Sequence, residues 1–309
     1  MKNLRVYEYF EKKPRAYEPS SRNDAHAPHH AASKRTTHQR QDHSVGPMPR
    51  KKKGLGQHFL RKQSTVDNMI AAVTITPETS IMEIGCGDGF LTKSILEQSP
   101  CKQVWCFEID KEWADYVGER IKTPRLTIHL QNILELDFDA TLTPHAPWVM
   151  LANLPYNITF PIIFSLIKNK HLFAEGVVMV QEEVAQKIVA DHGKRYNPTS
   201  LYLQHHFDWK LLEKIEPQAF TPAPKVYSRL LYFKPKANVP AIPDEENFWK
   251  FLKLCFKTPR QTIKNNLKST HLRGNPLISE DVLALRAQQM TVEQFLSLWN
   301  TIRLADENE

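Results

Sequence analysis

The sequence predicts an α/β fold in which helices cover a mostly parallel, seven-stranded sheet of the Rossmann-like kind, followed by a small all-helical domain. From residue 54 onward, short apolar strand-like runs alternate with helical patterns. A glycine-rich turn directly follows the first of these runs, as in folds that bind ligands at the carboxyl edge of a parallel sheet. After residue 236 only helical patterns remain. The 309 residues suffice for two such domains.

The predicted elements follow one another in a regular order. Strands are expected at 80–84, 103–109, 126–130, 148–152 and 176–180, with a later hairpin-type pair at 208–215 and 227–233. Helices are expected at 63–73, 91–97, 112–122, 161–168 and 183–191, and in the last part at 246–256, 260–267, 281–286 and 292–304. We therefore divide the chain into residues 1–53, 54–235 and 236–309.

Residues 1–53 are predicted to form a disordered basic tail. They hold several prolines, 13 Lys and Arg against 5 Asp and Glu, and no sustained apolar periodicity. Five histidines lie in this segment, but their spacing is irregular and no cysteine is near, which favours a solvated tail over a metal site. Its acidic residues are untypical of a transit peptide, and it has no apolar signal-peptide core.

Charge and cysteine content limit the class of protein. No apolar run approaches the roughly 18 residues of a membrane-spanning helix. The four cysteines lack the number and pairing of a disulfide framework, so we expect reduced thiols in the cytoplasm, with an organelle as the alternative. Lys and Arg also outnumber Asp and Glu by 11 to 3 across residues 225–275. Such a block predicts contact with a polyanion, which charge alone leaves open between RNA, DNA and an acidic membrane.

The turn Glu83-Ile84-Gly85-Cys86-Gly87-Asp88-Gly89 is placed to hold a nucleotide-like ligand. Its glycines allow a tight turn and a close approach of ligand to backbone. Glu108 ends the next strand, where an acid accepts hydrogen bonds from the two hydroxyls of a ribose. This spacing fits either a nicotinamide dinucleotide or S-adenosylmethionine. The third glycine comes one residue early for a dinucleotide, and Glu83 would repel a pyrophosphate but suit the ammonium of a methionine moiety.

Two further loops add candidate ligand contacts. After the third strand, Asn132 is placed to hydrogen-bond an adenine amino edge and Ile133 to cover the ring, although a plain loop fits equally well. The fourth strand runs into Asn153-Leu154-Pro155-Tyr156, which is the most specific signal in the chain. The Asn153 side-chain oxygen and the Leu154 carbonyl would accept the hydrogens of an adenine amino group. Pro155 stiffens the loop, and Tyr156 offers a flat face to an extruded base.

Five motifs together resemble one family. They are Gly56-Gln57-His58-Phe59-Leu60, the glycine turn, Asn153-Leu154-Pro155-Tyr156-Asn157-Ile158, Gln-Glu-Glu-Val-Ala at 181–185, and Phe220-Thr221-Pro222-Ala223-Pro224-Lys225-Val226. In this order they resemble the ribosomal RNA adenine dimethyltransferases, and most closely their small-subunit (KsgA-type) branch, over about residues 51–300. The resemblance implies a class I S-adenosylmethionine-dependent methyltransferase fold.

The resemblance also assigns roles to residues. Gln57, His58 and Leu60 would line the cofactor from the N-terminal side, with Ile109 and Ile133 beside its adenosine. Glu83, Gly85 and Gly87 would hold the methionine end, Glu108 the ribose and Asn132 the adenine. The target base would lie against Asn153, Leu154, Pro155 and Tyr156, with Phe220 on its other face. Three residues depart from the family pattern: His58 where Asn is common, Asn132 where Asp is usual, and Tyr227 where Asp is usual.

The implied reaction adds two methyl groups to the exocyclic nitrogen of an adenosine in small-subunit ribosomal RNA, during ribosome biogenesis. It needs no metal and no dedicated general base, so the rate should come from positioning. Contacts with RNA are expected from basic residues at three- and four-residue intervals, which would share one broad helical face: Lys253, Lys257, Arg260, Lys264 and Lys268. We expect a monomer that acts on ribosomal RNA or a precursor of the small subunit, away from membranes.

Two alternatives stay open. The Erm-type branch of the family methylates large-subunit ribosomal RNA, but it tends to have Ile where this chain has Leu154. Alternatively, the protein is mainly a ribosome-assembly or transcription-associated binding factor with secondary activity. The intact Glu108 and Asn153-Leu154-Pro155-Tyr156 argue against lost activity and leave a second role open.

Overall fold

A computed structural model describes residues 48–50, 52, 56–268 and 278–306 of the chain. The predicted disordered tail at 1–53, with its histidines, lies almost entirely outside the described residues. No described helix combines the length and apolar character needed to cross a membrane. The described residues also contain no group of three or more His, Cys, Asp or Glu side chains arranged to hold a metal ion.

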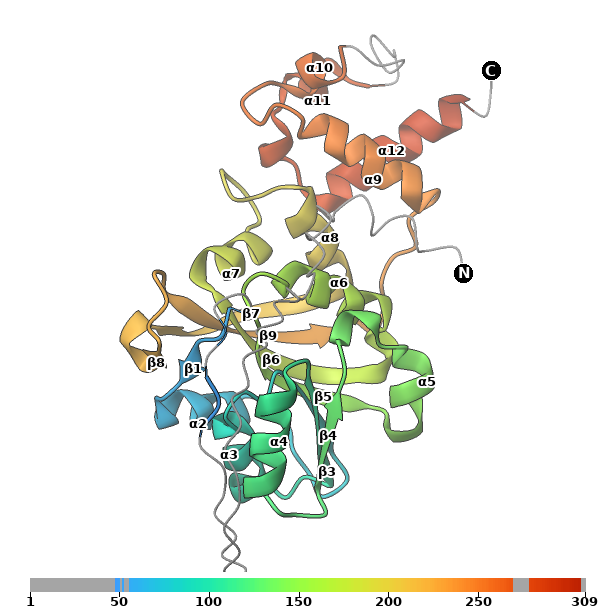
Figure 1. Cartoon of the computed structure of the whole chain (residues 1–309). Helices are drawn as coiled ribbons and strands as arrows, with labels where there is room; N and C mark the ends of the chain where they lie inside the picture. Colours follow the sequence, from blue (N-terminus) through green and yellow to red (C-terminus); the bar gives the residue numbers. More distant parts are fainter. Residues whose placement is uncertain (1–47, 51, 53–55, 269–277, 307–309) are drawn as a thin grey trace, which may run out of the picture.

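A seven-stranded sheet forms the centre of the larger domain (Figure 1). Its strands lie in the order β4-β3-β2-β5-β6-β9-β7, which confirms the predicted mostly parallel sheet. The bounds are β2 (Ser80–Ile84), β3 (Gln103–Glu108), β4 (Leu126–Leu130), β5 (Trp148–Asn153), β6 (Phe173–Gln181), β7 (Phe207–Ile215) and β9 (Ser228–Pro235). β9 is antiparallel to both β6 and β7. The strand order reverses between β2 and β5, where folds of this kind bind their ligands.

Helices cover both faces of this sheet. They are α2 (Gln63–Ala71), α3 (Phe90–Gln98), α4 (Lys111–Arg120), α5 (Phe138–Leu142), α6 (Thr159–Lys168), α7 (Glu182–Ile188) and α8 (Pro198–His206). Successive strand residues such as Ile81 and Met82 are fully buried in opposite apolar cores. Burial on both faces explains why the strands read as continuous apolar runs. The four cysteines are buried and unpaired.

The C-terminal helices pack directly against the sheet domain. They are α9 (Glu245–Cys255), α10 (Ile263–Asn266), α11 (Glu280–Ala284) and α12 (Val292–Asp306), and they lie above α8 in Figure 1. Trp249 of α9 meets Tyr202 of α8 edge to face, with ring centroids 4.9 Å apart. The Tyr196 hydroxyl donates a hydrogen bond to the Met290 carbonyl at 3.1 Å. One apolar core therefore runs through both domains.

The basic residues of this domain do not share one helical face, so that expectation is wrong. α9 ends at Cys255 and α10 begins only at Ile263. Pro259 lies between them; it cannot donate to the carbonyl four residues earlier, and it disfavours helical backbone at Thr258. The buried Asn266 side chain closes the resulting turn, accepting from the Thr258 N–H at 2.9 Å and donating to the Thr258 carbonyl at 3.2 Å. Lys257 and Arg260 lie in this turn rather than on a helix.

A second, two-stranded sheet was not predicted. β1 (Phe59–Leu60) pairs antiparallel with β8 (Phe220–Thr221), and Leu60 lies opposite Phe220. The Arg61 N–H continues the pairing by donating to the Ala219 carbonyl at 2.7 Å. These contacts fasten the N-terminal segment to the loop between β7 and β9, at one side of the larger domain (Figure 1).

Gly176 of β6 leaves no room for a side chain. A Cβ atom there would lie 2.7 Å from both the Met150 carbonyl oxygen and the Phe233 ring. We expect Gly176→Ala to lower the free energy of unfolding by roughly 1–3 kcal/mol, because the neighbouring strands must move apart. Chemical denaturation measures this. Gly118→Ala, in α4, is the matched control, since a Cβ atom there would lie 3.7 Å from its nearest neighbour, the Ile128 side chain of β4, and helical alanine is favoured by up to about 1 kcal/mol. Equal effects at the two positions would contradict the packing argument.

Candidate active site

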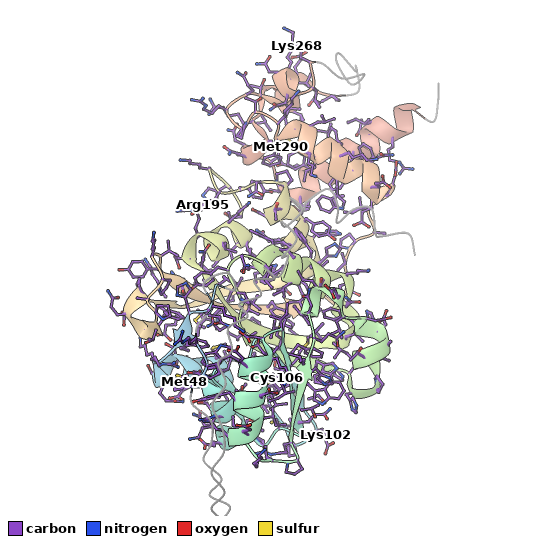
Figure 2. The ribbon with its side chains drawn as sticks, viewed as in Figure 1. Met48, Lys102, Cys106, Arg195, Lys268 and Met290 are labelled. Carbon is purple, nitrogen blue, oxygen red and sulfur yellow. The ribbon has the colours of Figure 1, made fainter. Side chains whose placement is uncertain are left out.

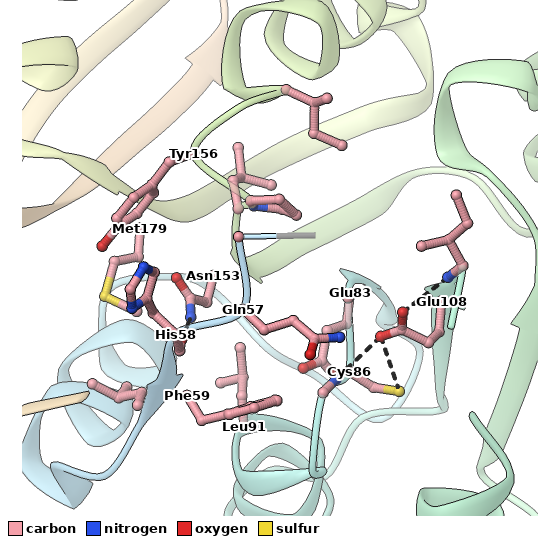
Figure 3. Close-up of a pocket in the computed structure, with 18 of the residues that line it drawn as sticks. Gln57, His58, Phe59, Glu83, Cys86, Leu91, Glu108, Asn153, Tyr156 and Met179 are labelled. Carbon is pink, nitrogen blue, oxygen red and sulfur yellow. Dashed lines mark hydrogen bonds between the residues drawn. The ribbon is translucent and has the colours of Figure 1, made fainter. Parts of the chain in front are cut away.

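A pocket of about 880 Å³ lies at the carboxyl edge of the sheet (Figure 3). Its size is in the range that binds small ligands, roughly 300–1,000 Å³. Thirteen of the predicted residues line it: Gln57, His58, Leu60, Glu83, Gly85, Gly87, Glu108, Ile109, Asn132, Asn153, Leu154, Pro155 and Tyr156. Parallel strands end at the same edge, so motifs that are far apart in the sequence converge there.

The N-terminal segment lies across the glycine turn. Gly87 has a φ of +53°, and a Cβ atom on it would lie 2.6 Å from the Phe59 ring. Both the backbone conformation and the contact therefore require glycine. Arg61 holds the same segment by an ion pair with Asp88 of the turn at 2.6 Å. The segment thus forms one wall of the pocket.

Glu83 is a buried carboxyl with one oxygen already bonded. It is 1% exposed, and its Oε2 accepts hydrogen bonds from Thr92 Oγ1 at 2.7 Å and Cys106 Sγ at 3.2 Å. Burial raises its pKa to about 7, because the charged form loses hydration that these two donors replace only in part. Among the described residues no cation pairs with it. A ligand ammonium beside Oε1 would therefore be favoured, which fits the methionine end of S-adenosylmethionine.

Glu108 ties the glycine turn to the end of β3. Its Oε1 accepts from the N–H groups of Ile109 and Asp110, both at 2.9 Å, and its Oε2 accepts from the Gly87 N–H at 3.2 Å. Burial raises its pKa, and the backbone donors oppose that rise. A carboxylate offers about four lone-pair directions. The backbone uses three, and the Cys86 thiol donates to Oε2 at 3.9 Å, so we expect one hydrogen bond to a ribose hydroxyl, formed in place of the weak thiol contact, rather than two.

The structure fixes which atom of the Asn153 amide is available for a ligand. Its Nδ2 donates to the His58 carbonyl at 3.0 Å. The Oδ1 atom accepts from no described residue. The Leu154 carbonyl also accepts from no described residue, and the Leu154 N–H donates to the Met179 carbonyl at 3.1 Å. Two unused acceptors therefore end β5. Figure 3 shows Asn153 on the side of the pocket where His58 and Tyr156 lie, across from Glu83 and Glu108.

His58 contacts the aromatic side of the pocket. Its ring stacks on Tyr156, with centroids 5.6 Å apart and planes inclined by 23°. Its Nδ1 lies 2.8 Å from the Pro222 carbonyl, which can only accept, so Nδ1 carries a proton. The Tyr156 hydroxyl and Ser228 Oγ lie 2.6 Å apart, and burial raises the pKa of Tyr156. The prediction placed His58 only beside the cofactor, whereas here it contacts the predicted base-stacking residue.

Two predicted residues lie outside the pocket lining. Phe220 is 3% exposed and pairs with Leu60 in the two-stranded sheet. Ile133 is buried in the main apolar core. Packing buries both side chains, so neither contributes to the pocket surface where we predicted them to contact the base and the adenine. Asn132 does line the pocket, but its Oδ1 caps the following turn through the Leu134 N–H at 3.1 Å.

Several lining residues were missed by the sequence analysis. Glu135 accepts from Asn132 Nδ2 at 2.8 Å and so places a carboxylate beside the predicted adenine contact. Met69 and Met179 add apolar surface. The motif spacing carries no signal for these side chains, since apolar strand and helix positions are normally core. Gln57, which was predicted, lines the pocket, and its side chain is held by a neighbouring residue: its Nε2 donates to Asp110 at 3.3 Å.

The five basic residues predicted to contact RNA differ in availability. Lys257, Arg260 and Lys268 are exposed, and no described acid lies within ion-pair distance of them. Lys264 pairs with Glu280 at 3.1 Å. Lys253 is half-buried on α9, and desolvation lowers its pKa. Lys268 lies at the end of the helical domain farthest from the sheet (Figure 2).

Comparison with known proteins gives a consistent result. A family model described as ribosomal RNA adenine dimethylase matches residues 48–304. A protein named ribosomal RNA small subunit methyltransferase A, from Prosthecochloris aestuarii, is 35% identical over 253 residues, covering 82% of this chain and 94% of the relative. A protein of the same name from Syntrophotalea carbinolica is 35% identical over 264 residues, covering 82% and 97%.

Two solved structures share the fold. A dimethyladenosine transferase from Plasmodium falciparum superposes with a TM-score of 0.68 at 23% identity, covering 80% of this chain and 98% of the other. The 23S rRNA methyltransferase ErmE superposes with a TM-score of 0.64 at 22% identity, covering 79% and 99%. These likenesses bear on the fold alone. They confirm the predicted class I methyltransferase architecture.

Burial of Glu83 predicts a pH-dependent stability. Its pKa is raised from 4.5 to about 7 on folding, so the folded state holds more protons than the unfolded state between these values. Stability must then fall as the pH rises through this window. We expect Glu83→Gln to remove this fall in the free energy of unfolding. Above pH 7, the free energy of unfolding of the variant should exceed that of the wild type by roughly 2–4 kcal/mol.

Urea unfolding at several pH values between 4.5 and 8 measures this effect. Glu97→Gln is the matched control, since Glu97 is exposed on α3. If the curves of Glu83→Gln and the wild type stay parallel, Glu83 does not titrate in this window.

Proposed function

The chain belongs to the ribosomal RNA adenine dimethylase family, and we propose that it methylates the exocyclic nitrogen of adenosines in small-subunit ribosomal RNA. The product is N6,N6-dimethyladenosine, formed in two transfers during ribosome biogenesis. The observation that carries this proposal is the pair of unused acceptors, Asn153 Oδ1 and the Leu154 carbonyl, at the end of β5. They lie in one pocket with the buried carboxyls Glu83 and Glu108.

S-adenosylmethionine, when bound, supplies a methyl group on a sulfonium centre, which passes to the nitrogen as the carbon–sulfur bond breaks. Glu83 and the backbone of Gly85 and Gly87 would hold its methionine end, and Glu108 would accept a hydrogen bond from its ribose. The side chain of Ile109 is exposed at the pocket and would cover an adenine face. Asn132 with Glu135 lies at the adenine edge. The residues present therefore fit this cofactor.

The two acceptors make the target nitrogen more nucleophilic. The lone pair of an adenine amino group is delocalised into the ring, so the group is planar and reacts poorly. Asn153 Oδ1 and the Leu154 carbonyl each accept one of its hydrogens and favour a pyramidal nitrogen with a localised lone pair. Oriented acceptors in a water-poor pocket stabilise the charge that develops on nitrogen. The proton becomes acidic once the methyl group is attached, so water can remove it and no side chain needs to act as the base.

Small-subunit RNA is the favoured substrate for a specific reason. The relatives that are 35% identical over most of their length are named as small-subunit enzymes. The large-subunit enzyme is similar in fold only, at 22% identity.

A role as a ribosome-assembly binding factor remains the alternative from another class, and it requires no turnover. We further propose that the protein acts as a monomer on small-subunit precursors in the cytoplasm, which light scattering and cell fractionation would check.

The Asn153 acceptor should matter for turnover more than for binding the cofactor. We expect Asn153→Ala to lower kcat by roughly 10²–10³-fold, while the Kd for S-adenosylmethionine changes far less. The measurement combines methyl transfer from labelled cofactor with calorimetric cofactor binding. Asn300→Ala, on the exposed side of α12, serves as the control.

The same assay identifies the substrate. Small-subunit particles, large-subunit RNA and DNA are offered in parallel to the wild type, and the products are digested to nucleosides. Label in dimethyladenosine from small-subunit particles is expected. Label in large-subunit RNA or DNA alone would refute the substrate assignment, and a normal kcat for Asn153→Ala would refute the role of Asn153.

Basic side chains of the turn between α9 and α10 should contribute salt-dependent RNA binding. We expect the double variant Lys257→Ala/Arg260→Ala to weaken binding to small-subunit RNA. It should also reduce the slope of log K against log salt by about 1.4–1.8, since each of the two phosphate contacts contributes about 0.7–0.9. Filter binding across a salt series measures this. Lys93→Ala/Lys111→Ala, which removes equal charge from lysines already paired on α3 and α4, should change the slope less. Equal slopes for the two double variants would rule out a special role for the turn.

A further inference from the structure

The loop from Pro222 to Tyr227, between β8 and β9, is anchored at one end to a residue of the pocket and at the other end to the start of α7. At one end the Pro222 carbonyl accepts from His58 Nδ1 at 2.8 Å. At the other end the Tyr227 carbonyl accepts from the Glu182 N–H at 2.9 Å. The next residue, Ser228, lies 2.6 Å from the Tyr156 hydroxyl through its Oγ. The loop is therefore held in place beside the side of the pocket that we assign to the target base.

The end of this loop exposes apolar surface that no packing in the described structure explains. Val226 is 43% exposed and Tyr227 is 49% exposed. Exposed large apolar side chains are few among the described residues, and these two are adjacent in sequence. Aromatic rings exposed in this way are commonly contact sites for a partner. The two residues lie within a segment that is closely tied to the pocket.

Two lysines lie beside this apolar surface. Lys214 Nζ of β7 lies 4.5 Å from the centroid of the Tyr227 ring, and Lys225 is exposed next to Val226. Glu182, the acid that interacts with Lys214, is held by Arg229 through two hydrogen bonds of 2.6 and 2.9 Å. The local charge is therefore positive. An exposed aromatic ring combined with lysines is the arrangement that binds single-stranded nucleic acid, by base stacking and phosphate contact.

We propose that Tyr227 and Val226, with Lys214 and Lys225, form a platform on which the RNA nucleotide next to the target adenosine stacks. This inference rests on the proposed function. Extrusion of the target base into the pocket separates it from its neighbour in the strand, which loses a stacking partner. Adjacent Cα atoms are about 3.8 Å apart, so Tyr227 lies immediately beside the Ser228 that holds Tyr156. The platform replaces the lost stacking and holds the strand at the pocket.

The platform predicts a split between KM and kcat. We expect Tyr227→Ala to raise the KM for small-subunit particles roughly five- to a hundredfold, in line with the loss of one aromatic–base stack. The kcat at saturating RNA and the Kd for S-adenosylmethionine should stay within about twofold. Tyr227→Phe keeps the ring and should restore the wild-type KM. Leu130→Ala, which removes an equally exposed apolar side chain at the other edge of the sheet, should change neither constant.

A direct binding measurement separates this inference from the proposed function. The probe is a ten-nucleotide single-stranded oligoadenylate that contains 2-aminopurine, whose fluorescence is quenched by stacking. Wild type and Tyr227→Phe should quench it, and Tyr227→Ala should not. If wild type methylates small-subunit particles while Tyr227→Ala shows an unchanged KM and equal quenching, the platform is wrong and the proposed function stands. If wild type transfers no methyl group but quenching depends on the ring, the function fails and the RNA platform stands. Binding of a ribosomal protein, rather than RNA, that depends on Tyr227 would overturn the platform.

Discussion

The geometry of the pocket depends on the hydrogen bond from the Asn153 amide to the His58 carbonyl. Without it, the amide could turn and present its N–H groups to an amino group that itself only donates. The partner of this bond comes from a segment almost a hundred residues earlier in the chain. That segment is held by the two-stranded sheet, by the contact of Phe59 with Gly87 and by the Arg61–Asp88 ion pair. The N-terminal segment is thus part of the site and not a cover over it.

The cofactor side of the pocket contains a buried carboxyl, Glu83, that reduces the stability of the protein without a ligand. Glu83 is buried among a hydroxyl and a thiol, and Glu108 among backbone N–H groups. A hydrophobic side chain at position 83 would pack at lower cost than a carboxyl that must lose its hydration, whereas the loss of Glu108 would leave three backbone N–H groups without their acceptor. Such costly positions are typical of functional sites. A ligand that brings an ammonium group to Glu83 supplies the missing charge partner. The unpaired carboxylate therefore favours binding of a cationic ligand over a pyrophosphate.

The sequence predicted the central strands well because they are buried on both faces and end in distinctive turns, and it also predicted the partly exposed edge strand β4. Ser80–Ile84 and Leu126–Leu130 have the predicted bounds. The helix Pro198–His206 was missed, since its buried residues occupy several faces and leave no helical periodicity. The strands at Phe59 and Phe220 are two residues long and exist only through pairing across the chain. The same pairing explains why Phe220 is buried, which its proline-rich motif could not indicate. The basic face was predicted from spacing alone and neglected Pro259.

The shared core of the two domains bears on how a target is chosen. Trp249 packs on Tyr202, and Tyr196 bonds to Met290 across the same boundary. A contact of this kind resists bending, unlike a polar domain interface, which permits relative motion. On the proposed function, the turn that holds Lys257 and Arg260 therefore lies at a fixed position relative to Asn153. RNA that is bound at both places must present its adenosine at a set separation from the phosphates. Selection of the target then follows from the shape of the RNA more than from its base sequence, as is usual where proteins bind folded RNA.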